Sequence, residues 1–125
     1  MSPDRFDAAM AQMLGEAARL LRPDRFAVFV VGSVRDKDGS ILDMRRCMSA
    51  GCEKAGLRLV NDAVLINATG TAAVRAKRGF LTARTLTRVH QEVLIYVKGD
   101  RKRAAQRMGE PDRGSLLDAM EDTEK

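Results

Sequence analysis

An apolar run at residues 26–31, FAVFVV, constrains the fold of this chain more than any other feature. It is rich in β-branched residues and is closed by Gly32, a pattern typical of a strand that is covered on both faces. A second run at residues 59–67 follows a segment with helical spacing. The order strand, helix, strand requires a right-handed crossover, which makes these two strands parallel. The chain is therefore predicted to be an α/β domain with residues 26–31 as a central strand.

Capping residues and apolar spacing predict the other elements. Ser2 is predicted to cap a first helix that ends before Pro23, and Ser40 to cap a second helix. Another apolar run, ending at Gly99, predicts a third strand that runs antiparallel to the first two. The predicted helices cover residues 3–21, 40–55 and 100–108, and the third strand covers residues 91–97.

The segment between the second and third strands, residues 70–88, is too polar and too irregular for a core element. We expect a long loop there, of the kind that often carries function. The end of the first strand, the end of the second and the start of the third fall on one edge of the sheet, where open α/β sheets bind ligands. Arg35, Asp36 and His90 should therefore lie near this basic loop.

The net charge of +5 is concentrated in one part of the chain, because residues 75–113 hold eleven Lys and Arg against four acidic residues. Such a cluster is typical of surfaces that bind phosphate, although solvated basic faces are common on other proteins. The loop cations are the predicted DNA contacts: Arg75, Lys77, Arg78, Arg84 and Arg88. The cations of helix 100–108 cover almost all of its faces, so solvation is the expected state there.

Length and composition predict one domain at residues 1–109, followed by a flexible polar tail at residues 110–125. No apolar run is long enough to span a membrane and no secretory signal is recognisable, so a cytoplasmic protein without a membrane partner is expected. Cys47 and Cys52 are five residues apart in a predicted helix. With a single histidine elsewhere they predict buried free thiols and no metal site.

Three segments, RFAVFVVGSVRDKDG, AGLRLVNDAVLINATGT and RVHQEVLIYVKGD, resemble in order and spacing the C-terminal half of phage and bacterial DNA amino-methyltransferase-like domains. The resemblance covers residues 1–109. It implies a Rossmann-like sheet of an S-adenosylmethionine-dependent enzyme. In that family the last strand is antiparallel and lies between the two strands before it. Residues 26–31, 59–67 and 91–97 would then form a partial, three-stranded sheet with 91–97 in the middle.

The chain lacks two motifs of that family, namely the Gly-rich cofactor loop and the Pro-Pro-aromatic motif that holds an extruded base. Its prolines Pro3, Pro23 and Pro111 are never adjacent. We therefore expect a truncated, split or recruited domain that does not transfer methyl groups by itself and has no catalytic residues of its own. S-Adenosylmethionine is expected only if another chain supplies the missing half.

The resemblance places Arg35, Asp36 and His90 beside a vestigial base pocket. For His90 the favoured interpretation is structural, because an acid or base needs a partner and a bound substrate, and neither is evident. Arg35 and Asp36 are expected to pair with each other or with a nearby turn, and base recognition is the alternative.

In the whole family fold another strand would flank residues 26–31, so here Phe26, Val28 and Val30 should form an exposed interface edge. A homodimer or a protein partner is expected on this edge. Three functions remain open: a domain that retains the DNA-facing half of the fold, a protein-interaction or inhibitor module of phage origin, and half of a split methyltransferase completed in trans.

Overall fold

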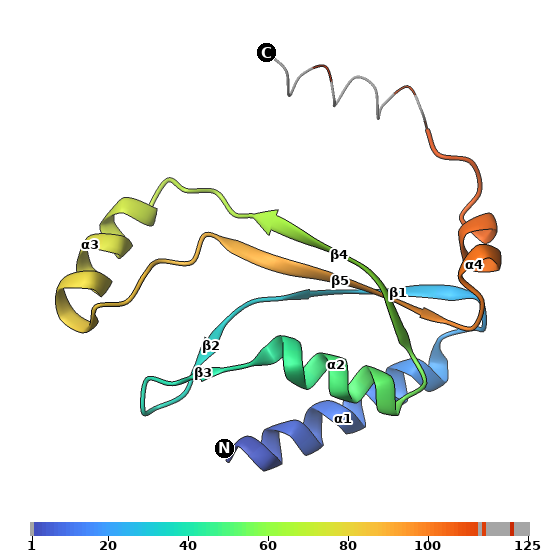
Figure 1. Cartoon of the computed structure of the whole chain (residues 1–125), viewed down its shortest axis with the longest axis horizontal. Coiled ribbons are helices and arrows are strands. Elements are labelled where there is room, and N and C mark those ends of the chain that lie inside the picture. The colour runs from blue at the N-terminus through green and yellow to red at the C-terminus, as the bar shows by residue number, and fades with distance from the viewer. Residues whose placement is uncertain (1, 113, 115–120, 122–125) are drawn as a thin grey trace.

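The computed structural model describes residues 2–112, 114 and 121 (Figure 1). Most of the predicted tail at residues 110–125 therefore lies outside the described residues. The elements, in chain order, are α1 (Pro3–Leu20), β1 (Arg25–Val31), β2 (Val34–Arg35), β3 (Ile41–Leu42), α2 (Met44–Lys54), β4 (Arg58–Ile66), α3 (Ala72–Ala83), β5 (His90–Lys98) and α4 (Arg101–Arg107).

The main sheet has three strands in the order β1-β5-β4. Strand β5 is antiparallel to both neighbours, pairing Val28 with Ile95 on one side and Ala63 with Val93 on the other. The two outer strands consequently run in the same direction. This confirms the predicted α/β class and the position of the third strand between the first two.

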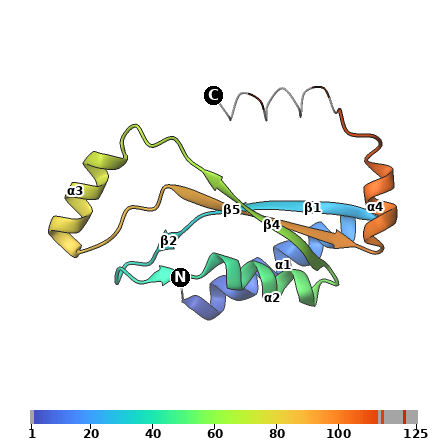
Figure 2. The same ribbon diagram turned by 45° about the horizontal axis from the view of Figure 1, so that its top comes forward.

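Helices α1 and α2 pack against each other and cover one face of the sheet (Figure 2). The core lies between these two layers and includes Leu14, Met48, Leu94 and Tyr96. The Tyr96 ring meets Phe29 edge to face at 5.9 Å, and its hydroxyl lies 3.2 Å from Ser49 Oγ, which gives this buried phenol a polar partner.

Both cysteines are free and buried, as predicted from the sequence. Burial raises the pKa of the Cys52 thiol to about 11, so the thiol stays protonated at neutral pH. Burial also raises the pKa of Cys47, followed by the hydrogen bond that its thiol donates to Asp7 Oδ1 at 2.8 Å. Neither thiol has the lowered pKa of a reactive cysteine.

The opposite face of the sheet is largely open. Val28 and Val30 alternate with the core residues of β1 and are 58% and 53% exposed. Only the end beside α4 is covered, where Val97 and Ala104 are buried. The prediction of a central strand covered on both faces is therefore wrong, because β1 lies at the edge of the sheet and pairs with β5 alone among the described residues.

The predicted helix cap at Ser40 is also wrong. The chain stays extended through a short hairpin, β2 and β3, whose turn contains Gly39 at φ 85°. Ser40 belongs to this turn and donates to Asp38 Oδ1. Helix α2 begins only after Asp43, whose side chain accepts a hydrogen bond from Arg46 N at 3.0 Å.

Residues 70–88 are not a continuous loop, because they contain the twelve-residue helix α3. The helix ends at Arg84, which adopts the left-handed conformation at φ 53°. No side chain of α3 is buried, which agrees with the prediction that this segment is not a core element. The helix projects beyond the end of the sheet, away from α4 (Figure 1).

A polar contact joins the start of β1 to the end of β5. Asp24 is buried and accepts hydrogen bonds from Asp100 N at 2.8 Å and Arg103 Nε at 2.9 Å. The Asp100 amide and the Arg103 guanidinium together lower the pKa of this carboxyl. Gly99, at φ 88°, passes directly beside Asp24. No helix in the described part of the chain is long and apolar enough to cross a membrane.

Candidate nucleic-acid interface

The stretch of chain between Asp62 and Glu92 carries five Lys and Arg residues and no acidic residue. It contains the end of β4, helix α3 and the connection into β5. The two acids that border it are already neutralised, because Arg45 lies 2.9 Å from each of their carboxylates. The positive charge of this end of the molecule is therefore uncompensated by nearby carboxylates of the described chain.

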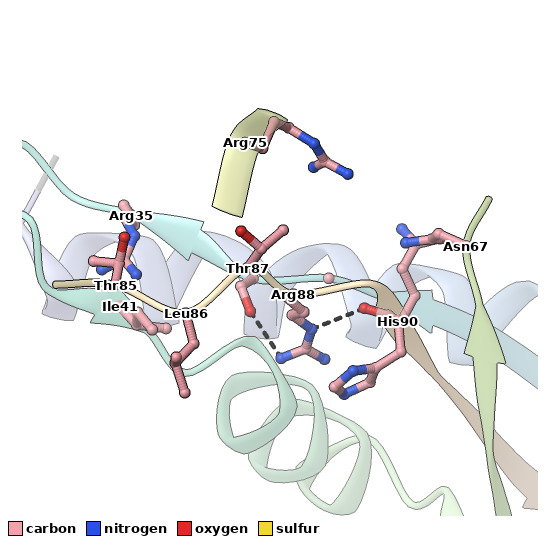
Figure 3. Close-up of a pocket in the computed structure, with 12 residues that line it drawn as sticks. Arg35, Ile41, Asn67, Arg75, Thr85, Leu86, Thr87, Arg88 and His90 are labelled. Atoms are coloured by element: carbon pink, nitrogen blue, oxygen red, sulfur yellow. Dashed lines mark hydrogen bonds between the residues drawn. The ribbon is translucent and has the colours of Figure 1, made fainter. Parts of the chain in front are cut away.

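A cavity of about 600 Å³ opens on this end of the molecule, between the β2–β3 hairpin, α3 and the start of β5 (Figure 3). This volume is in the range of cavities that hold small ligands. Three arginines and the histidine line it, and no Asp or Glu does. The polar lining residues that bear on function are Arg35, Asn67, Arg75, Thr87, Arg88 and His90.

Arg88 is held in a fixed position in the cavity wall. Its Nη1 donates to Ser33 Oγ and its Nε to the carbonyl oxygen of His90, both at 2.8 Å. Its Nη2 lies 3.9 Å from a carboxylate oxygen of Glu92, a distance at which the attraction is weak. Several of its N–H groups remain available to a ligand.

Arg35 and Arg75 enter the cavity from opposite sides. Arg35 donates through Nη1 to the Gly39 carbonyl at 2.8 Å, so the hairpin turn orients it. The guanidinium of Arg75 extends from α3 over the cavity toward Asn67 (Figure 3). Within the described part of the chain, no hydrogen bond or ion pair engages the Arg75 side chain.

The residues assigned to a base pocket are only partly brought together. Arg35 and His90 line the cavity, whereas Asp36 does not. The backbone of Asp36 closes the hairpin turn with Ser40 and Gly39, and its carboxylate accepts from Lys37 N at 2.7 Å. His90 pairs with Ile66 in the sheet through its backbone. Its imidazole has no hydrogen-bond partner among the described residues.

The other predicted DNA contacts lie outside the cavity. Lys77, Arg78 and Arg84 are exposed on or directly after α3. The guanidinium of Arg84 lies 5.4 Å from the centre of the Phe80 ring and donates to the Phe80 carbonyl at 3.1 Å. Lys77 and Arg78 have no side-chain partner in the described chain, so they are free to meet a phosphate.

Sequence reasoning missed Asn67, Ser33 and Thr87 in this site. Asn67 directly follows β4, and its backbone N–H donates to Val89 O at 2.8 Å. A polar residue directly after a strand was the available signal for Asn67. No signal existed for Ser33 and Thr87, because the hairpin and the path of residues 85–88 place them.

The cavity does not fit S-adenosylmethionine. That cofactor carries a sulfonium and an ammonium group, and three guanidinium groups without a carboxylate would repel both. No cluster of three potential metal ligands occurs in the part of the chain that the structure describes. The arrangement of charges instead suits an anion.

Comparison with known proteins identifies the fold. No protein-family model and no curated protein matches the chain. Two crystal structures of a protein from Thermus thermophilus, named as a DNA modification methylase, superpose on it. The selenomethionine derivative gives a TM-score of 0.58, and the complex with S-adenosyl-L-methionine gives 0.57. Both are 18% identical and cover 78% of this chain.

The described chain therefore has a methyltransferase-like fold, as the resemblance implied. It spans only 38% of the length of the methylase that it matches. The matched protein's activity and cofactor belong to that protein, and the likeness carries over the fold alone.

Proposed function

We propose that this chain is a DNA-binding domain with a methyltransferase-like fold, and that the exposed cations of α3 contact the phosphate backbone. The observation that carries the proposal is the acid-free basic stretch between Asp62 and Glu92, which forms a helix projecting from the end of the sheet. Cations on an exposed helix release counterions when they meet phosphates, which favours binding without sequence preference.

Helix α4 is also basic, but its surroundings differ. Arg103 pairs with Asp24 at 2.9 Å and serves the fold. Arg101 and Lys102 are exposed and solvated at the other end of the molecule, away from the cavity (Figure 1). They therefore provide a matched control, with the same charge on a different helix.

Replacing Lys77 and Arg78 together by Gln should weaken binding to a DNA duplex about ten-fold or more. It should also reduce the dependence of log affinity on log salt by about 2, since each lost phosphate contact removes about one unit. The measurement is fluorescence anisotropy with a labelled duplex at several salt concentrations. The control, Arg101→Gln with Lys102→Gln, should retain most of the affinity. Equal losses in both variants would mean that net charge alone governs binding and would contradict a role for α3.

The cavity beside α3 is the proposed vestige of a base pocket. Arg35 and His90 line it together with Arg75, which supports the assignment suggested by the family resemblance. Asp36 would act only through the hairpin turn that it closes. Methyl transfer by this chain alone is not part of the proposal, because the cavity repels the cationic cofactor and the family's catalytic motif is absent from the sequence.

A second candidate function, protein interaction, is favoured by the open face and free edge of the sheet. Val28 and Val30 are more than half exposed, Phe26 is half-buried, and β1 has one unpaired edge among the described residues. An exposed apolar edge strand readily pairs with another chain. The partner would be a second copy, an inhibited or regulated protein, or a chain that supplies the rest of a methyltransferase fold. The 38% coverage of the matched methylase supports the last of these.

Replacing Val28 and Val30 by Lys should abolish self-association if the edge forms a homodimer, because buried unpaired charge is costly. Sedimentation velocity of the intact chain in the micromolar range is the measurement. The wild type should sediment as a dimer and the variant as a monomer. A wild type that stays monomeric over the whole concentration range would rule out the homodimer and leave only a different protein as partner.

A further inference from the structure

We propose that the cavity beside α3 is a phosphate-binding site in its own right, with Arg75 and Arg88 as its principal ligands. The occupant is the phosphate group of a nucleotide, either within a DNA strand or free. This inference deepens the proposed function, because it assigns the cavity cations a task separate from the backbone contacts of Lys77 and Arg78.

The first argument is the charge of the cavity wall. Arg35, Arg75 and Arg88 come from three separate segments, and no carboxylate lines the cavity with them. Like charges brought together in this way destabilise the empty site, and an anion removes that cost. The nearest acid, Glu92, lies 2.9 Å from Arg45 and only 3.9 Å from Arg88. It is therefore engaged mainly elsewhere.

The second argument is the difference between the two main ligands. Arg88 is ordered by Ser33 and by the His90 carbonyl, so little side-chain freedom is lost when an anion binds. Arg75 has no partner in the described chain and extends over the cavity mouth (Figure 3). One guanidinium is thus pre-organised, and the other is free to close on the ligand.

The third argument is the chemistry of the remaining wall. Planar guanidinium groups bind phosphate oxygens through two parallel hydrogen bonds, which point charges such as Lys cannot match. Asn67 and Thr87 add neutral hydrogen-bonding groups, and Ile41 and Leu86 add apolar surface. A cavity of about 600 Å³ is larger than a phosphate ion requires. It therefore leaves room for the sugar and base of a nucleotide.

The test is a titration of the isotope-labelled intact chain followed by amide chemical shifts, at constant ionic strength. The probes are inorganic phosphate, then dAMP, then a short DNA duplex. The reporter amides are those of Ser33, Asn67 and His90, and the amides of α4 report general salt effects. The key variant is Arg75→Met. Arg78→Met is its control, because Arg78 lies on the same exposed helix but outside the cavity.

We expect saturable shifts of the three reporter amides with dAMP, weakened about ten-fold in Arg75→Met and unchanged in Arg78→Met, since a charge-assisted hydrogen bond is worth about 1.5–3 kcal/mol. Saturation by phosphate and dAMP identifies a free nucleotide as the source. Saturation by the duplex alone identifies a DNA strand, and either result supports the site.

Two results would overturn the proposal: no shift of the reporter amides with any probe, or equal weakening in Arg75→Met and Arg78→Met. The proposed function is judged separately, by the duplex affinity of the Lys77 and Arg78 double variant. Loss of the cavity site therefore leaves backbone binding by α3 untouched, and failure of backbone binding leaves the dAMP result intact.

Discussion

Leu94→Ala should lower the free energy of unfolding by about 2–5 kcal/mol, the largest effect that we expect from a single substitution in this chain. Leu94 is fully buried at the middle of β5, the central strand, and belongs to the core cluster beneath α1 and α2. Removing its branched side chain loses the transfer free energy and leaves a cavity that surrounding strands cannot easily fill. Urea denaturation followed by circular dichroism measures the change.

Leu20→Ala provides the matched control for this substitution. Leu20 is 73% exposed at the end of α1, where Ala is an equally good helix former. Its replacement should change the free energy of unfolding by no more than about 0.5 kcal/mol. A similar loss in both variants would contradict the placement of the core between the sheet and the two helices.

Gly99→Ala should be the second most damaging change. Gly99 adopts φ 88°, and an added Cβ would lie 2.6 Å from Asp24 Oδ1 and 3.1 Å from Asp24 N. The left-handed backbone alone costs about 1–2 kcal/mol for Ala. Crowding in a packed site adds about 1–3 kcal/mol. The substitution would also displace the carboxylate that accepts from Asp100 N and Arg103 Nε.

Gly56→Ala separates the two contributions. Gly56 has a similar φ of 82°, but an added Cβ would meet nothing within 4 Å. Only the backbone term should appear there, so Gly56→Ala should be clearly milder than Gly99→Ala in the same denaturation experiment. Equal effects would show that crowding against Asp24 is unimportant and that the contact between the ends of β1 and β5 is looser than the structure has it.

The sequence predicted the elements whose residues face the core. Strands β4 and β5 and helix α1 agree with their predicted ranges to within one or two residues, because buried apolar runs and a Ser-Pro start are strong local signals. The order of the strands came from the family resemblance. Local patterns alone give direction, and pairing is decided by long-range contacts.

The errors lie where tertiary context overrides local patterns. Ser40 and Asp43 are both acceptable caps, and pairing of Ile41 with Arg35 decides between them by keeping the chain extended. Helix α3 was missed because it buries nothing, so its sequence has no clear apolar face to reveal it.

The candidate site was predicted in part. Arg35, Arg75, Arg88 and His90 do line one cavity, as expected from strand ends that meet at one edge of the sheet. Asp36 does not line it, because its backbone and carboxylate are used by the hairpin turn. Which cations face the cavity and which face outward depends on the helical phase of α3, and a segment taken for a loop has no phase.

The central claim is that the basic end of this methyltransferase-like domain binds the DNA backbone, and the salt dependence of wild-type binding tests it most directly. Anisotropy of a labelled duplex should show tight binding at low salt, with log affinity falling linearly against log salt. If three to five of the cations at this end of the molecule meet phosphates, the slope should lie between about −3 and −5. No binding at low salt, or a slope near zero, would contradict the account and leave the open sheet face as the functional surface.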